Sequence, residues 1–366
     1  RSVTVSNTPN LVNPFYPGAD PFPFTPDPAN ATFLPGANIF SLQPGYHNIP
    51  SVQEFSLGVQ QQYGTRWSSQ LTYVANVSRH LNITRDEDGP IYRPNCTNAT
   101  CNSTAQKNAR RPFNLQYPAN PLTYAAISEV LPSSNASYHS LQAVLTRHFD
   151  RRFSLSASYV WSKAMAYGAT VDNYNIRSSY GPSGDDMPQK FTVSYIYALP
   201  SINHFGFLGK EVLGGWQVNG ITTLRSGQPF NVTSGTDTNF DGTNNDRPNQ
   251  IGNPLLPKGR SRAAMVAQYI TIAAFAPLPA GTATGEGNTH FDSIYSPNSF
   301  NTDLSAFKTF PLFERVNAQF RAEAFNAFNN VTFYGPSAVL SSPANFGRIS
   351  SSSGGRVLQF ALRLSF

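Results

Sequence analysis

The last eleven residues, 356–366, constrain the fold of this chain more than any other stretch. Within them, every second position carries a large apolar residue: Leu358, Phe360, Leu362, Leu364 and Phe366. Side chains of a β-strand alternate between its two faces, so the segment predicts a strand with one apolar and one mostly polar face. An exposed apolar face that ends on an aromatic residue is difficult to explain in water.

The same alternation recurs along the chain. It occupies residues 51–63, 66–78, 137–149, 152–163, 189–199, 216–225, 304–310 (the least regular) and 315–325. Most of these segments are near the ~9–11 residues that a tilted strand needs to cross a bilayer. Small Ser, Thr, Asn and Gln side chains dominate the polar positions, which suits the wet lumen of a wide barrel better than a soluble sheet.

Composition agrees with this interpretation. Only 13% of the residues are charged, against about 25% in ordinary soluble domains. The mean hydropathy of −0.32 is typical of a soluble chain, but transmembrane β-strands hide their hydrophobicity in alternation. No apolar run approaches the ~20 residues of a membrane helix. The net charge of +6 is spread along the chain without a basic run, so we predict no nucleic-acid partner.

The connections between the predicted strands alternate in length. Those near 63–66, 149–152 and 311–314 are very short, and 200–215 is moderate. The others are long: 79–136, 164–188, 227–303 and 328–354. Structureless loops this long are uncommon in soluble domains, whereas transmembrane barrels combine short periplasmic turns with long extracellular loops. In this topology residues 1–5 end an upward strand, and residues 6–50 form an outer loop.

The fold class is therefore predicted as all-β, an antiparallel transmembrane β-barrel. Nine strands and a remnant make about ten, too few for a closed barrel with such loops, and an open edge in lipid leaves backbone groups unsatisfied. The chain also starts at Arg1 rather than Met. We expect the C-terminal part of a larger barrel whose first strands are missing. The alternative is a soluble β-sandwich or propeller with decorated loops.

Several phrases resemble a known family. They are YHSLQA at 138–143, SYVWSK at 158–163, DDMPQKF at 185–191, YALP at 197–200, GGWQVNG at 214–220, SGQPF at 226–230, NNDRPN at 244–249, FKTF at 307–310 and FRAEAFNAFN at 320–329. Together and in this order they resemble the barrel of TonB-dependent outer-membrane receptors, specifically the Oar-like subgroup. The resemblance runs from about Pro14 to Phe366.

The resemblance implies energised uptake through a 22-stranded barrel filled by an N-terminal plug, whose TonB box contacts the TonB–ExbB–ExbD complex. Residues 1–366 would be the C-terminal part of that barrel, about ten strands of 22. The chain departs from the family pattern because it lacks the plug, the TonB box and the N-terminal regulatory-like domain, so the activity belongs to a longer parent chain. The bacterial outer membrane is the expected location.

The terminal apolar face resembles the C-terminal signal of bacterial outer-membrane barrels. Leu358, Phe360, Leu362, Leu364 and Phe366 are therefore expected to form the barrel-assembly signal. The resemblance implies two partners for this strand, the barrel-assembly machinery and outer-membrane lipid.

One segment resembles the first half of a calcium-binding loop. Gly242 follows three oxygen-bearing residues at positions one, three and five, which is the order that calcium loops use. The candidate ligands are Asp237, Asn239, Asp241, Asn244 and Asp246. The bidentate Glu of position twelve is replaced by Pro248. The alternative is a hairpin rich in Asx turns, in which the same side chains cap the backbone.

Cys96 and Cys101 are the only cysteines and lie five residues apart in a polar loop. Two cysteines are too few for structural zinc. A local disulfide in an oxidising compartment fits better than the alternative of two free thiols.

Catalytic patterns are absent from the sequence, so we predict that the chain is not an enzyme. The six histidines are scattered, and neither a Gly-x-Ser-x-Gly elbow nor a phosphate loop occurs. Asp185 and Asp186 are adjacent carboxylates, but their place in a long loop just before a strand indicates a structural role. No cofactor is predicted besides calcium.

The predicted function is TonB-dependent uptake of an unidentified ligand at the long outer loops. These loops are polar and rich in Asn and Tyr rather than charge, which favours a neutral glycan or peptide over an anionic ligand. Arg110 and Arg111 leave an anion open. Two alternatives remain: a structural, adhesive or secretion-related barrel without energised import, and a soluble secreted enzyme.

Overall fold

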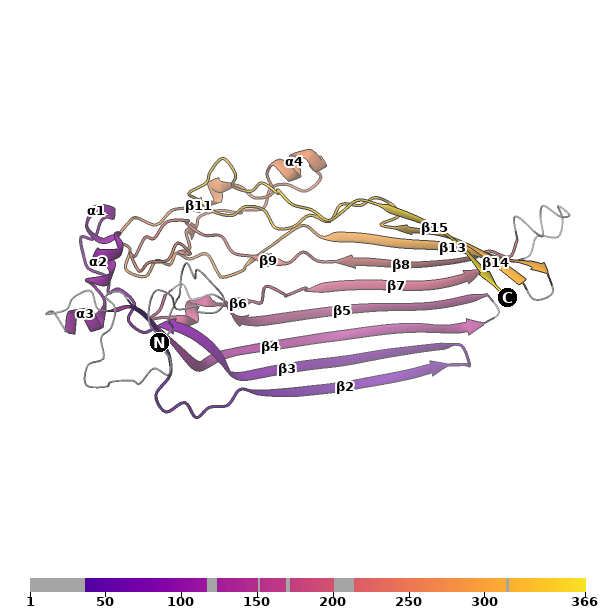
Figure 1. Cartoon of the computed structure of the whole chain (residues 1–366), viewed down its shortest axis with the longest axis horizontal. Helices are drawn as coiled ribbons and strands as arrows, with labels where there is room; N and C mark the ends of the chain where they lie inside the picture. Colours follow the sequence, from indigo (N-terminus) through magenta and orange to yellow (C-terminus); the bar gives the residue numbers. More distant parts are fainter. Residues whose placement is uncertain (1–36, 117–123, 151, 169–171, 201–213, 314–315) are drawn as a thin grey trace, which may run out of the picture.

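The computed structural model describes all residues except 1–36, 117–123, 151, 169–171, 201–213 and 314–315. Its main feature is one antiparallel sheet in the order β15-β14-β13-β8-β7-β5-β4-β3-β2 (Figure 1). These strands are β2 (Ser51–Tyr63), β3 (Trp67–Asp86), β4 (Tyr124–Asp150), β5 (Phe153–Tyr167), β7 (Gln189–Ala198), β8 (Gln217–Arg225), β13 (Ser299–Phe313), β14 (Val316–Phe325) and β15 (Val357–Ser365). Each pairs with its neighbours in the order, so the sheet is a meander of up-and-down strands.

Two short strands join the sheet outside this order. Strand β1 (Ala37–Leu42) pairs with β4 in parallel, and β6 (Tyr180–Pro182) pairs with β5. The expectation that residues 6–50 form only a loop is therefore wrong for β1. The predicted strand remnant at 1–5 lies outside the described residues.

All nine predicted strand segments are strands, and β2 has the predicted bounds. Strands β3 and β4 are longer than predicted, however, because 79–86 and 124–136 belong to the sheet and not to the loop. Register shifts between Ser78, Leu81 and Ile83 interrupt the ladder, and His80 has a positive φ of 56°. Such bulges break the period-two alternation, so the strand predicted from that alternation ended before the strand in the structure does.

The register aligns the apolar positions of successive strands into rows across one face. One row consists of Val59, Leu71, Ala143, Tyr159, Phe191, Leu224 and Phe300. The neighbouring positions form a mainly polar row on the other face: Gln60, Gln70, Val144, Ser158, Thr192, Thr223 and Asn301. A slip of one residue in any strand would exchange its two faces, so this register is the one that keeps both faces continuous.

Lys308 explains why 304–310 was the least regular segment. Its register partner is Phe320, which places the lysine on the apolar face. The side chain is 4% exposed, donates from Nζ to the Gly214 carbonyl and lies 5.1 Å from the centroid of the Phe310 ring. The lysine thus keeps its stem on apolar surface while its ammonium reaches a polar partner near the strand end.

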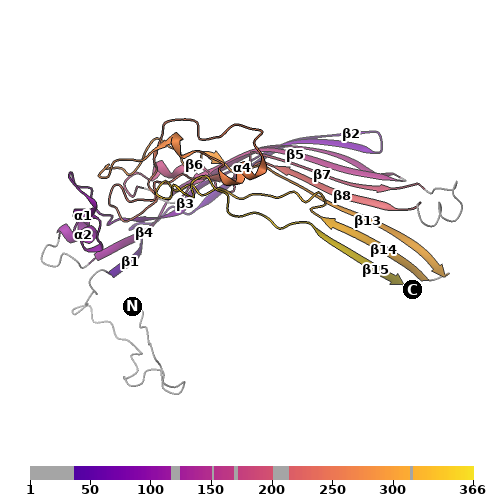
Figure 2. The same cartoon turned by 90° about the horizontal axis from the view of Figure 1, so that it is seen from above.

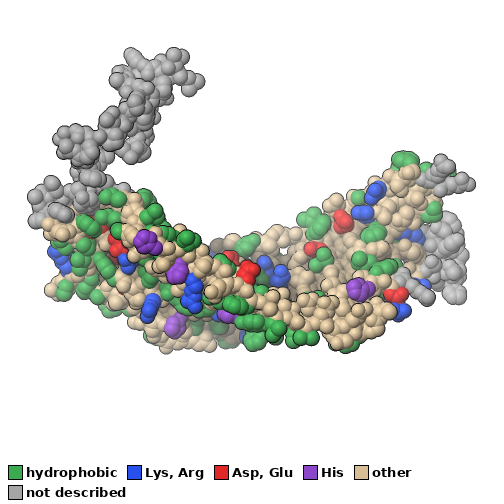
Figure 3. Space-filling view, turned by 90° about the horizontal axis from the view of Figure 1, so that it is seen from below, with side chains coloured by type: hydrophobic (Ala, Val, Ile, Leu, Met, Phe, Trp, Pro, Cys, Tyr) green, Lys and Arg blue, Asp and Glu red, His purple; other side chains and the backbone are tan. Residues whose placement is uncertain are grey.

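The sheet curves across its width and stays open, with β2 and β15 at its two edges (Figure 2). Figure 3 shows the hollow of the curved sheet, with acidic and basic side chains inside it. Arg321 on β14 donates from Nε to Gln319 Oε1 over 2.7 Å and lies over the Phe307 ring. No helix among the described residues is long and apolar enough to cross a membrane.

The two faces of β15 give a direct test of this arrangement. Phe360 is on the apolar face and stacks on Phe320, whereas its neighbour Gln359 is on the polar face opposite Glu323. An arginine on a lipid-facing position costs about 2–4 kcal/mol near the bilayer midplane. Phe360→Arg should therefore destabilise the barrel by that amount and Gln359→Arg by much less, measured by urea unfolding in phospholipid vesicles. Equal effects would contradict the assignment of the faces.

Candidate functional site

The long connections lie together at one end of the sheet, opposite short turns such as Gly64–Arg66 (Figure 1). We call the described residues of 87–116, 172–188, 226–298 and 326–356 the loop layer. Its apolar core consists of Val232, Ile270, Ala274, Phe275, Ile294, Ala338 and Phe346. These residues come from the last two connections, so the main buried core of the described chain lies in its loops. The loop layer is therefore a folded unit.

Connection 226–298 contains several short elements. They are β9 (Pro229–Phe230), β10 (Asn249–Gln250), α4 (Arg262–Ala267), η4 (Ile272–Ala274), β11 (Phe275–Ala276) and β12 (Ile294–Tyr295). Strands β9 and β12 pair with each other, and β10 pairs with β11. These small ladders satisfy backbone groups that a buried loop would otherwise leave without partners.

A disulfide-bonded unit forms one corner of the loop layer. Cys96 and Cys101 are bonded, with their Cα atoms 5.5 Å apart, and both pack against the fully buried Phe240. Three short helices follow: α1 (Asn98–Cys101), α2 (Thr104–Asn108) and α3 (Pro112–Gln116). The local disulfide thus fixes a surface on which the distant 234–246 segment docks.

Arg110 and Arg111 are parts of this docking and do not face a ligand. Arg110 is 3% exposed and donates to the carbonyl oxygens of Ile91, Cys101 and Phe240. Arg111 is 8% exposed and donates to Asp86 Oδ2 over 2.7 Å. Buried guanidinium groups with these partners hold loops together. The suggestion that they meet an anionic ligand is therefore wrong.

In the calcium-like loop, protein groups occupy the acidic oxygens. Asp237 accepts from the Asp241 and Gly242 amides over 2.9 Å each, and its Oδ2 pairs with Lys107 Nζ at 2.9 Å. Thr243 donates to Asp241 Oδ1 from both its amide and its hydroxyl. This is the Asx-turn arrangement, with a lysine ammonium beside the acids.

The remaining candidate ligands differ in exposure. Asp246 is fully buried and accepts from Thr238, and burial raises the pKa of its carboxyl to about 7. Asn244 is exposed. Among the described residues, no three His, Cys, Asp or Glu side chains are grouped closely enough to hold a metal ion. Calcium binding at Asp237, Asn239, Asp241, Asn244 and Asp246 stays a prediction.

Asp186 connects the sheet to the loop layer. Its fully buried carboxylate accepts from the Ala164 amide over 2.6 Å, from Lys163 Nζ over 2.9 Å and from the Tyr295 hydroxyl over 2.6 Å. Lys163 lies on β5 and Tyr295 on β12. Burial, aided by the Asp186 carboxylate, raises the pKa of the Tyr295 hydroxyl, so the group remains a donor. The structural role expected for the 185–186 pair thus belongs to Asp186.

Close backbone packing joins the same two regions. A Cβ atom on Gly168 would lie 1.9 Å from Phe291 Cζ, and one on Gly181 would lie 2.5 Å from the Phe291 carbonyl oxygen. Only glycine permits these approaches. Phe291 in turn lies under the buried Arg247 guanidinium, which pairs with Glu286 over 2.9 Å. Gly168 at the end of the sheet's β5 strand and Gly181 in β6 therefore pack tightly against connection 226–298.

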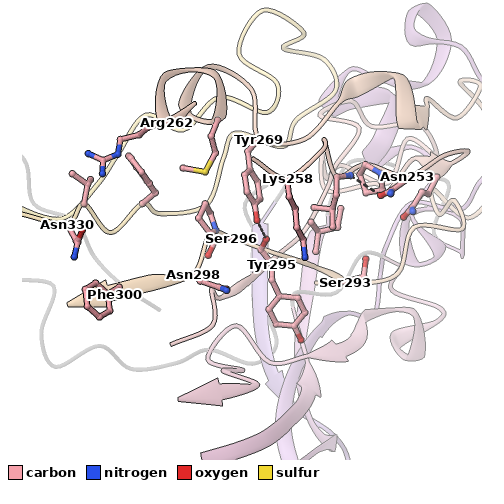
Figure 4. Close-up of a pocket in the computed structure, with 18 of the residues that line it drawn as sticks. Asn253, Lys258, Arg262, Tyr269, Ser293, Tyr295, Ser296, Asn298, Phe300 and Asn330 are labelled. Atoms are coloured by element: carbon pink, nitrogen blue, oxygen red, sulfur yellow. Dashed lines mark hydrogen bonds between the residues drawn. The ribbon is translucent and has the colours of Figure 1, made fainter. Parts of the chain in front are cut away.

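A cavity of about 880 Å³ opens between α4 and the start of β13 (Figure 4). The 253–269 segment, the 290–300 segment and residues 330–333 contribute to its lining. Tyr269 donates from its hydroxyl to the Tyr295 carbonyl over 2.9 Å, so two walls of the cavity are connected. The pocket thus combines parts of the chain about 30 to 80 positions apart in sequence.

The basic residues of this cavity were missed by the sequence analysis. Lys258, Arg260 and Arg262 fall within five positions, and that local cluster was the available signal. The net charge was described as spread along the chain without a basic run, which overlooks this segment. His290, another lining residue, carried no local signal because its place in the cavity depends on the fold.

Asp292 lies in the 290–300 segment, and we expect it to make the free energy of locally opening that segment depend on pH. It is 9% exposed with a positive φ of 47°, and burial raises the pKa of its carboxyl to about 6, against the lowering effect of Arg247. When the segment is locally open, the Asp292 carboxyl loses its proton near pH 4. When the segment is closed, the same carboxyl loses its proton near pH 6. Closing is therefore most favourable below pH 4, and the free energy of opening falls as pH rises from about 4 to 6.

The change in that free energy should be about 2 kcal/mol. Asp292→Asn stays neutral and tolerates the positive φ, so it should remove this part of the slope. Hydrogen exchange of peptides covering 288–296, corrected for the chemical exchange rate, measures it. An unchanged slope in Asp292→Asn would contradict the assignment to this carboxyl.

The chain matches one family model and several solved structures. Residues 1–359 match the family model of the outer membrane beta barrel domain. Matching solved structures include the outer membrane transporter YddB from Escherichia coli, at 12% identity and a TM-score of 0.44, covering 86% of this chain and 32% of that one. FpvA of P. aeruginosa bound to heterologous pyoverdines matches at 11% identity and a TM-score of 0.40, covering 86% and 27%. No curated protein sequence matches.

The chain thus spans about a third or less of the length of these solved structures. The family match covers nearly the whole chain. This chain therefore belongs to the outer membrane beta barrel domain family and lies in the bacterial outer membrane.

Proposed function

We propose that this chain is part of the barrel of an active outer-membrane transporter of the TonB-dependent, Oar-like type. Its loop layer captures an unidentified ligand from outside the cell. The observation that carries the proposal is the loop layer itself, which has its own apolar core, a disulfide-bonded corner and a cavity of about 880 Å³. Long loops that only cap a passive barrel need no such preorganised cavity.

The open sheet supports the part of the proposal that concerns further strands. Strands β2 and β15 each have an unpaired side among the described residues, and backbone groups unpaired in lipid are costly. Additional strands of the same protein would pair with these edges. We assign the plug and the TonB box, which couple a transporter to the proton-motive force, to that remaining part.

No reaction is assigned to the chain. The buried carboxylate most suggestive of chemistry, Asp186, has its oxygens engaged by Ala164, Lys163 and Tyr295. Those contacts give it a positioning role between β5 and β12. Transport rather than catalysis is consistent with that role.

Cross-linking to TonB tests the proposal without knowledge of the ligand. Formaldehyde is applied to cells that produce the complete, tagged protein, and the purified protein is probed for TonB. A TonB adduct is expected, and it should disappear when the residues of the TonB box are deleted. Absence of an adduct in cells whose other transporters give one would contradict the proposal and favour a structural, adhesive or secretion-related barrel.

A further inference from the structure

The cavity beside α4 is lined by basic and aromatic side chains and by no acidic one. Lys258, Arg262 and His290 are its basic residues, and no Asp or Glu belongs to the lining. All three are exposed and can therefore meet a ligand from solution. Charge of one sign on a concave surface concentrates ligands of the opposite charge.

Neither Lys258 nor Arg262 is neutralised by a neighbour. Among the described residues, no carboxylate forms an ion pair with either side chain. Arg260, which lies between them in sequence, behaves differently. Its guanidinium donates to the carbonyl oxygens of Pro257, Ala264 and Gln268. One arginine thus fixes the shape of the segment while its two basic neighbours keep their charges available.

The aromatic part of the lining is fixed in place. Tyr269 and Tyr295 both use their hydroxyl groups within the protein, as donors to the Tyr295 carbonyl and to Asp186 Oδ2 respectively. Phe300 and Phe333 add two further rings to the lining. In the view of Figure 4, Arg262 and Lys258 lie on either side of Tyr269. Apolar ring surface and cationic groups therefore occur in one cavity.

We propose that this cavity binds an anionic ligand that also carries an aromatic or other flat apolar group. The anionic group contacts Lys258 and Arg262, whose guanidinium can donate two parallel hydrogen bonds to a carboxylate or phosphate. The apolar group packs against the tyrosine and phenylalanine rings. The volume is within the range of small-molecule sites, about 300–1,000 Å³. This inference deepens the proposed function by naming its ligand class, and it replaces the expectation of a neutral glycan or peptide.

The test compares two probes that share a ring and differ in charge. Isothermal titration calorimetry measures the binding of 1-naphthyl phosphate and of 1-naphthyl β-D-glucoside to the complete protein in detergent micelles at 50 mM NaCl. The phosphate is expected to bind about tenfold more tightly than the glucoside, and about fivefold less tightly at 500 mM NaCl. Equal binding of the two probes, or no binding of either, overturns the proposal.

A pair of matched variants assigns the binding to this cavity. Lys258→Gln with Arg262→Gln should weaken the phosphate probe about five- to tenfold. Arg93→Gln with Arg177→Gln removes the same charge from exposed loop positions outside the cavity and should change nothing. Equal loss in both variants, or in neither, overturns the proposal. Binding to the purified protein needs no TonB, so failure of this test and failure of the cross-linking test are separate results.

Discussion

The structure depends on one constraint, the pairing of backbone amides and carbonyls between antiparallel neighbours. In a bilayer these groups find no water, so the ladder must be continuous. Once the ladder is continuous, the register decides which side chains share a face. The row from Val59 to Phe300 is the result on the apolar face, and the row from Gln60 to Asn301 is its polar counterpart. Neither row would survive a slip of one residue in a strand between them.

The same ladder supports the loop layer. Strands β3 and β4 continue past the predicted ends to Asp86 and back to Tyr124, so the disulfide-bonded corner starts from a rigid ribbon. Asp186 then joins β5 to β12 through Lys163 and Tyr295. Because the described residues form no second layer against the sheet, their burial is found mainly in the loops. A few buried polar contacts between the sheet and the loop layer therefore fix the position of the cavity.

Local sequence pattern was sufficient for the strands, because alternation is a property of neighbouring residues. It failed at the bulges near His80, where the pairing is irregular, and it was weak at Lys308, a charged residue on the apolar face. It could not find the cavity, whose walls join Lys258 to His290 and Asn330 through the fold. Counting charges over the whole chain also concealed the three basic residues at 258–262. Arg110 is an error of the opposite kind: the sequence left it available to an anionic ligand, but the side chain is buried.

The central claim is that the sheet has one face toward lipid and one toward water. Single cysteines placed along β5, at 154 to 159, test it most directly, with a water-soluble maleimide applied to outer membranes that contain the complete protein. Cys96 and Cys101 are bonded to each other, and the protein without an introduced cysteine, treated in the same way, gives the background labelling of any other thiol. Replacements of Ser154, Ser156 and Ser158 should be labelled, and those of Leu155, Ala157 and Tyr159 protected. Uniform labelling of all six positions, or protection with a period other than two, would contradict the account.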